Sequence, residues 1–117
     1  MFRQVGCDNC HAPNLATGTS PVPAISHRVF QPFSDFLLHD MGTLGDGIVQ
    51  GRASGRQMRT APLWGLSARP SYLHDGRAKT AEAAILEHAG QGSESRHRYM
   101  DLRPWERAAL LAFLQSL

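Results

Sequence analysis

The chain has 117 residues and a mass of 12.9 kDa, enough for one domain and too little for a second hydrophobic core. Apolar residues make up 42% and charged residues 19%, which is typical of a folded chain and excludes a disordered tail. The formal net charge of +2 is too small to predict a nucleic-acid-binding surface. No apolar run approaches the roughly 20 residues that span a bilayer, so membrane insertion is not expected.

The first elements expected in chain order are short and separated by loops. A short helix is expected over Met1 to Cys10, before Pro13 ends it. Residues 12–32 contain four prolines and predict an irregular loop. A second short helix is expected over Asp35 to His39, with Ser34 as its N-cap.

The middle of the chain again favours loops. Residues 42–57 hold five glycines and predict a second long loop. Residues 60–66 are apolar but contain Pro62, so a turn of helix and extended chain both remain open.

Two stronger helix signals follow. Thr80 is a good N-cap for a helix that we expect to run to Gly90. Pro104 suits the first turn of a last helix, which continues to the C-terminal residue. Helical spacing predicts a buried stripe on that helix, made of Trp105, Ala109, Ala112, Phe113 and Leu117.

No stretch alternates strictly enough to predict a strand. The expected fold is therefore all-α, a cytochrome c-like domain of three to five short helices with long loops. Long loops are uncommon in a compact domain unless something holds them in place, and a large buried cofactor would do so.

Cys7, Cys10 and His11 form a C-x-x-C-H motif, the attachment signature of c-type haem. Two thiols at this spacing can each form a thioether with a haem vinyl group, and the adjacent His11 then reaches the iron. The alternatives are a dithiol redox site, which would need a βαβ context, and a zinc site, which would need two further ligands. The motif and the loops together predict one covalent haem c, with His11 as an iron ligand.

The second axial ligand of the iron is open from the residues alone. Among the candidates, His88 stands out because the expected helix surrounds it with small and apolar side chains, which would let a flat macrocycle approach. A core histidine bonded to a backbone carbonyl is the alternative interpretation of His88. The candidates are Met41, Met58, Met100, His27, His39, His74, His88 and His97.

Five stretches of the sequence carry specific patterns in a specific order. They are FRQVGCDNCH, FSDFLLHDMG, MRTAPLWGL, YLHDGRAKTAEAAILEHAG and RPWERAALLAFLQSL. Together they cover nearly the whole chain and resemble the C-terminal haem domain of the bacterial di-haem cytochrome c peroxidases. Related di-haem oxidoreductases and thiol oxidoreductases share the same patterns.

The resemblance implies roles for individual residues. In that domain the distal iron ligand lies fourteen residues after the His of an HDG motif, and counting from His74 leads to His88. His88 is therefore the expected second iron ligand, with Met58 and Met41 as rivals. His74 and Arg77 are expected to line the haem edge without binding iron.

Two arginines and two aromatic residues are candidates for contact with the haem. Arg59 and Arg77 could pair with the haem propionates, because a guanidinium matches a carboxylate bidentately, although surface arginines are nearly as good an interpretation. Trp64 and Tyr72 are expected in the haem wall or the core.

These expectations define a function. An iron with two His ligands has no open position, so we expect an electron-transfer module whose partner is a redox protein or an N-terminal haem domain. A peroxidase or oxidoreductase acting at an openable haem site is the alternative. Because the family's full proteins carry two haems, residues 1–117 are expected to be a single c-type cytochrome domain, excised or truncated from a longer di-haem protein.

The resemblance also implies a compartment. Covalent c-type haem is attached outside the bacterial cytoplasm, so a periplasmic location is expected. Residues 1–4 lead straight into the motif, so no signal peptide is expected on this chain.

Overall fold

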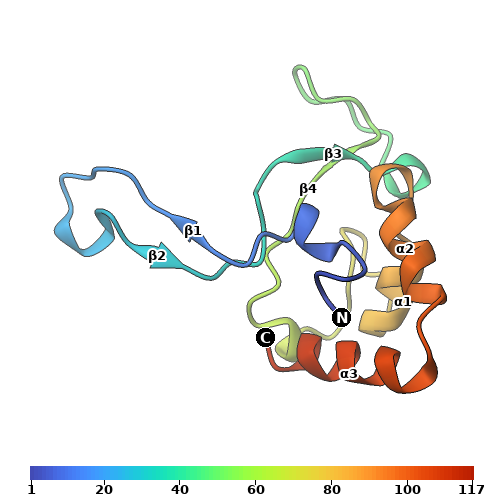
Figure 1. Cartoon of the computed structure of the whole chain (residues 1–117). Helices are drawn as coiled ribbons and strands as arrows, with labels where there is room; N and C mark the ends of the chain where they lie inside the picture. The colour runs from blue at the N-terminus through green and yellow to red at the C-terminus, as the bar shows by residue number, and fades with distance from the viewer.

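The computed structural model describes all 117 residues and contains three α-helices and four short strands (Figure 1). The helices are α1 (Ala81–Leu86), α2 (Ser93–Met100) and α3 (Pro104–Gln115). The strands pair antiparallel, β1 (Leu15–Ala16) with β2 (Val29–Phe30) and β3 (Leu38–Asp40) with β4 (Gln57–Arg59). Single turns of 3-10 helix connect them: η1 (Cys7–Asn9), η2 (Pro23–Ile25), η3 (Gly42–Leu44), η4 (Leu66–Ala68) and η5 (Gly90–Gly92).

The all-α prediction is wrong, because the chain is 35% helical and 12% strand, with two small antiparallel sheets. The clearest miss is the helix expected over Asp35 to His39. Phe36 has a φ of 58°, a left-handed conformation that cannot continue a right-handed helix, and the chain then enters β3. Ser34 still bonds the Phe36 N–H at 2.9 Å, but it forms a turn, and its own hydroxyl donates to the Thr60 carbonyl.

The first ten residues also differ from the expected helix. They form consecutive turns that end in η1, because Gly6 adopts a φ of 83° directly before it. The predicted loop over residues 12–32 carries the β1–β2 pair. In Figure 1 this segment projects from the body of the molecule as a long arm with η2 at its tip.

The C-terminal half contains the helices, which lie together on one side of the molecule (Figure 1). The Thr80 prediction is confirmed, since its hydroxyl accepts the Ala83 N–H at 3.0 Å. Helix α1 ends at Leu86, earlier than expected, so His88 lies just beyond it. Pro104 opens α3 as predicted, whereas α2 carries no apolar periodicity and buries only Tyr99. None of these helices has the length and apolarity to cross a membrane.

The predicted buried stripe on α3 is wrong, because a different face of the helix is buried. Trp105 is 58% exposed and Phe113 37% exposed, whereas Glu106, Leu110 and Leu114 face the interior. Because α3 is apolar on more than one side, spacing alone does not identify its buried face. The core cluster consists of Val5, Leu66, Tyr99, Leu102, Leu110 and Leu114.

Leu110→Ala is therefore expected to lower the free energy of unfolding by about 2–5 kcal/mol, because Leu110 is 1% exposed and its loss leaves a cavity. Trp105→Ala is the matched control on the same helix. Trp105 is largely exposed, and its ring centre lies 4.5 Å from the Arg103 guanidinium, so its loss should cost less than about 1 kcal/mol. Guanidinium unfolding of both variants measures the difference, and a larger loss for Trp105→Ala would contradict the observed face.

Candidate functional site

An apolar cavity lies between the N-terminal turns, α1 and the C-terminal part of α3. Its volume is about 440 Å³, including the space open to solvent, and nine of its eleven lining residues are hydrophobic. An apolar lining with a few polar groups is typical of a pocket for a cofactor or a small ligand. The lining residues are Phe2, Cys7, His11, Leu63, Leu66, Tyr72, Ala81, Ala84, Ile85, His88 and Leu114.

Two imidazoles, His11 and His88, lie in this otherwise apolar lining. The His11 Nδ1 lies 3.0 Å from the Phe33 carbonyl oxygen, and the His88 Nδ1 lies 2.7 Å from that of Ala84. A carbonyl can only accept, so each Nδ1 carries the proton and donates it. Each Nε2 is then left with its lone pair, the arrangement that orients a histidine ligand toward a metal.

The two rings are spaced as one metal ion between them would require. Their centres are 6.5 Å apart and their planes are tilted by 51°. An iron bonded to both Nε2 atoms at about 2 Å, with each ring centre about 1.1 Å further out, separates the centres by roughly 6.2 Å. The two residues come from distant parts of the chain and still meet at this spacing.

Both imidazoles are neutral at neutral pH. Burial is the main reason that the pKa of His11 is lowered to about 4. The hydrogen bond to the Phe33 carbonyl acts in the opposite direction, and the neighbouring His88 contributes a smaller lowering. Burial also lowers the pKa of His88. The neutral form is the one that binds a metal, so the cavity keeps both side chains ready to act as ligands.

Residues 1–117, the whole chain, match the family described as "Di-haem oxidoreductase, putative peroxidase". The chain belongs to the di-haem oxidoreductase family. No curated protein and no solved structure matches it. Membership of a di-haem family implies haem binding, and an apolar cavity with two neutral imidazoles fits a haem.

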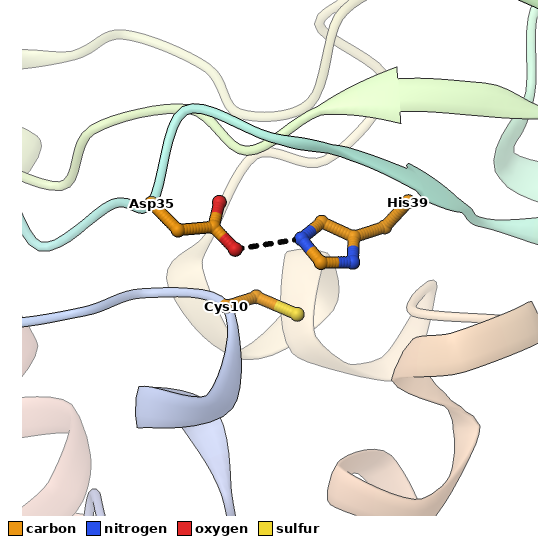
Figure 2. Close-up of side chains that lie close together, drawn as sticks. All are labelled: Cys10, Asp35 and His39. Atoms are coloured by element: carbon orange, nitrogen blue, oxygen red, sulfur yellow. Dashed lines mark hydrogen bonds and ion pairs between the residues drawn. The ribbon is translucent and has the colours of Figure 1, made fainter.

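In this member of the family the two cysteines of the motif face different surroundings. Cys7 lines the cavity, and burial raises the pKa of its thiol to about 11. Cys10 lies outside the cavity lining, beside Asp35 and His39 (Figure 2). Burial and then the Asp35 charge raise the pKa of the Cys10 thiol. Both thiols are free, without a disulfide.

The two methionine rivals for the iron do not line the cavity. Met58 pairs with His39 across β3 and β4. Met41 comes closer, because its Cε and the His88 ring lie 3.1 and 3.2 Å from the position that a Cβ on Gly92 would occupy. The structure thus brings His88, and neither methionine, into the cavity with His11.

The other predicted site residues lie around the cavity or at the surface. His74 is exposed and outside the lining. The exposed Arg77 already has two acidic partners, Asp75 at 2.5 Å and Glu87 at 3.9 Å. Arg59 is exposed, with its guanidinium 5.8 Å from the centre of the Phe36 ring.

Of the two predicted wall aromatics, Tyr72 lines the cavity and Trp64 is 47% exposed. The Trp64 ring lies 6.2 Å from that of Phe30, at the base of the arm. Its neighbours Leu63 and Leu66 line the cavity instead, and the sequence analysis did not name them. Their only sequence signal is their position in APLWGL, on either side of Trp64.

An aromatic cluster that was not expected from the sequence lies next to the cavity. The rings of Phe2, Phe33 and Phe113 meet edge to face at 5.4 to 5.9 Å. This packing stabilises the turn that holds the Phe33 carbonyl against His11. The side chains come from three separate segments, so no local pattern could have indicated the cluster.

Proposed function

We propose that this chain carries one covalently attached haem c and transfers electrons through it. Thioethers at Cys7 and Cys10 would hold the haem, with His11 and His88 as the two axial ligands. The observation that carries the proposal is the pair of neutral imidazoles, 6.5 Å apart in one apolar cavity. The adjacent C-x-x-C-H motif supports covalent attachment.

The bound haem would supply a one-electron couple between ferric and ferrous iron. The protein's own contribution is to hold and insulate its ligands. The Phe33 and Ala84 carbonyls orient the two rings and increase the basicity of each Nε2. Leu63, Leu66 and Ile85 keep water away from the same space, which reduces the reorganisation that accompanies electron transfer.

A haem with two imidazole ligands has no position left for a substrate, so its chemistry is limited to passing electrons. Peroxidase or oxidoreductase activity at an openable site is the second candidate, and the family description supports it. One observation also favours it. His88 lies between α1 and η5, in a segment outside regular helix, so its release from a metal would not require a helix to unwind.

Rapid mixing of the oxidised protein with hydrogen peroxide separates the two candidates. We expect the absorption spectrum of the haem to stay unchanged over milliseconds to seconds, because both axial positions are taken. The control is the same mixing experiment on a high-spin haem protein with an open axial position. A rapid change in the spectrum of the wild-type protein would favour the enzyme and contradict the electron-transfer proposal.

We also propose a periplasmic location and a redox partner, either a separate protein or a second haem domain of a longer chain. Exposed apolar side chains support a docking surface: Trp64, next to the lining residue Leu63, is 47% exposed, and Val29 on the arm is 73% exposed. Fractionation of cells that make the native protein should place the haem-bearing chain in the periplasm. Cytosolic protein with haem fully attached would contradict this.

A further inference from the structure

A second group of ligand-type side chains lies outside the cavity (Figure 2). It consists of Cys10, Asp35 and His39, whose potential ligand atoms all lie within 4.8 Å of one another. The Asp35 Oδ2 and the His39 Nε2 are 2.8 Å apart, and these side chains are only 16% and 18% exposed. Figure 2 shows the Cys10 sulfur turned toward the imidazole of His39.

Two backbone hydrogen bonds and one strand pairing position the three residues of this group. The Asp35 N–H donates to the Cys10 carbonyl at 2.8 Å, which ties the end of the C-x-x-C-H motif to the turn after Ser34. The Leu37 N–H donates to the Asp35 Oδ1 at 2.9 Å and fixes the carboxylate. His39 is the middle residue of β3 and pairs with Met58 in β4.

We propose that Cys10, Asp35 and His39 form a Zn²⁺ site in the chain before haem is attached. Thiolate, carboxylate and imidazole are the three ligand types that zinc prefers, with bond lengths of about 2.0–2.3 Å. A tetrahedral ion with such bonds needs ligand atoms about 3–4 Å apart, close to the separations of at most 4.8 Å in this group. Three protein ligands leave the fourth position to water.

The charges of the group favour a divalent cation. Binding of a divalent cation would displace the proton of the Cys10 thiol, and the cation would then neutralise the two negative charges of the thiolate and the carboxylate. No basic side chain forms an ion pair with Asp35 apart from His39.

The site uses only one of the two thiols of the C-x-x-C-H motif. Cys7 lines the cavity and does not belong to the group around Cys10. If Cys10 also forms a thioether, as the proposed function requires, zinc and haem attachment compete for the same sulfur. An uncharged thioether is a poor zinc ligand, so the metal site would exist only before attachment.

Co²⁺ is the spectroscopic probe for this site, added to the haem-free chain. We expect a thiolate-to-cobalt charge-transfer band in the near ultraviolet, which Zn²⁺ displaces. Cys7→Ala should keep the band and Cys10→Ala should lose it, so the two cysteines form a matched pair. His39→Ala and Asp35→Asn should weaken Co²⁺ binding by at least about tenfold. His97→Ala, at an exposed position, is the control that should bind as the wild type does.

Three results would overturn the proposal. One is the absence of any thiolate band in the wild type at saturating Co²⁺, which also covers a haem-free chain that cannot organise the site. Another is equal loss of the band in Cys7→Ala and Cys10→Ala, which would indicate chelation by the dithiol. The third is unchanged affinity in both His39→Ala and Asp35→Asn. Covalent haem is measured separately, from the mass of the chain expressed with haem attachment, so either proposal can fail without the other.

Discussion

His88→Ala is expected to convert the oxidised haem from low-spin to high-spin. The substitution removes one of the two imidazoles in the cavity. Under the proposed ligation, His11 would then be the only axial ligand from the protein. Absorption and electron paramagnetic resonance spectra of the oxidised protein measure the spin state. Reactivity toward peroxide should appear in this variant, because a position on the iron is then open.

His88→Met should keep six ligands and raise the reduction potential instead. A thioether stabilises ferrous iron relative to an imidazole, and axial ligands tune haem potentials over about 0.8 V in all. Met41→Ala and Met58→Ala are the matched controls, since neither methionine lines the cavity. If His88→Ala stays low-spin with an unchanged potential, His88 is a core histidine held by the Ala84 carbonyl.

The double variant Cys7→Ala with Cys10→Ala is expected to lack covalent haem and to unfold at a much lower temperature than the wild type. Only 14 of the 117 residues are buried, so the core is thin, and the cavity presents an apolar surface. A bound haem stabilises the folded state by mass action and covers that surface, and a domain of this size has little else to replace it. Thermal melts followed by circular dichroism, together with the mass of the chain, measure both effects.

His97→Ala is the control for this pair, since it changes an exposed residue outside the motif. It should keep its haem and its melting temperature. A colourless double variant that unfolds cooperatively near the wild-type melting temperature would show that the fold does not depend on the haem.

The sequence predicted the features that depend on neighbouring residues. The Thr80 cap and the Pro104 start of α3 are local signals, and the structure confirms both. The C-x-x-C-H spacing is likewise local. His88 was singled out by a face of small side chains, and Ala81, Ala84 and Ile85 line the cavity with it, although the residue lies just past the end of α1.

The features that the sequence did not predict depend on distant contacts. Strands β1 to β4 are two or three residues long, too short for an alternating pattern, and each exists through its partner across a loop. The helix expected after Ser34 fails because that hydroxyl bonds the distant Thr60 carbonyl. On α3, Glu106 is buried because it accepts the Arg103 N–H at 2.9 Å and so caps the helix, which no hydrophobic spacing indicates.

The cluster of Cys10, Asp35 and His39 has the same origin. It combines a residue of the motif with two residues that were expected in a helix. In that helix Asp35 and His39 would also have been neighbours, at positions i and i+4, but only the observed turn brings them to Cys10. The spacing of Asp35 and His39 therefore indicates that they can pair, whereas nothing in the sequence indicates their contact with Cys10.

Near-infrared magnetic circular dichroism of the oxidised, haem-bearing protein tests the central claim most directly, because it identifies the two axial ligands of the iron. The account predicts a bis-imidazole signal from His11 and His88, without the band that marks charge transfer from a methionine sulfur to iron. A sulfur-to-iron band that disappears in Met58→Ala or Met41→Ala, and persists in His88→Ala, would contradict it.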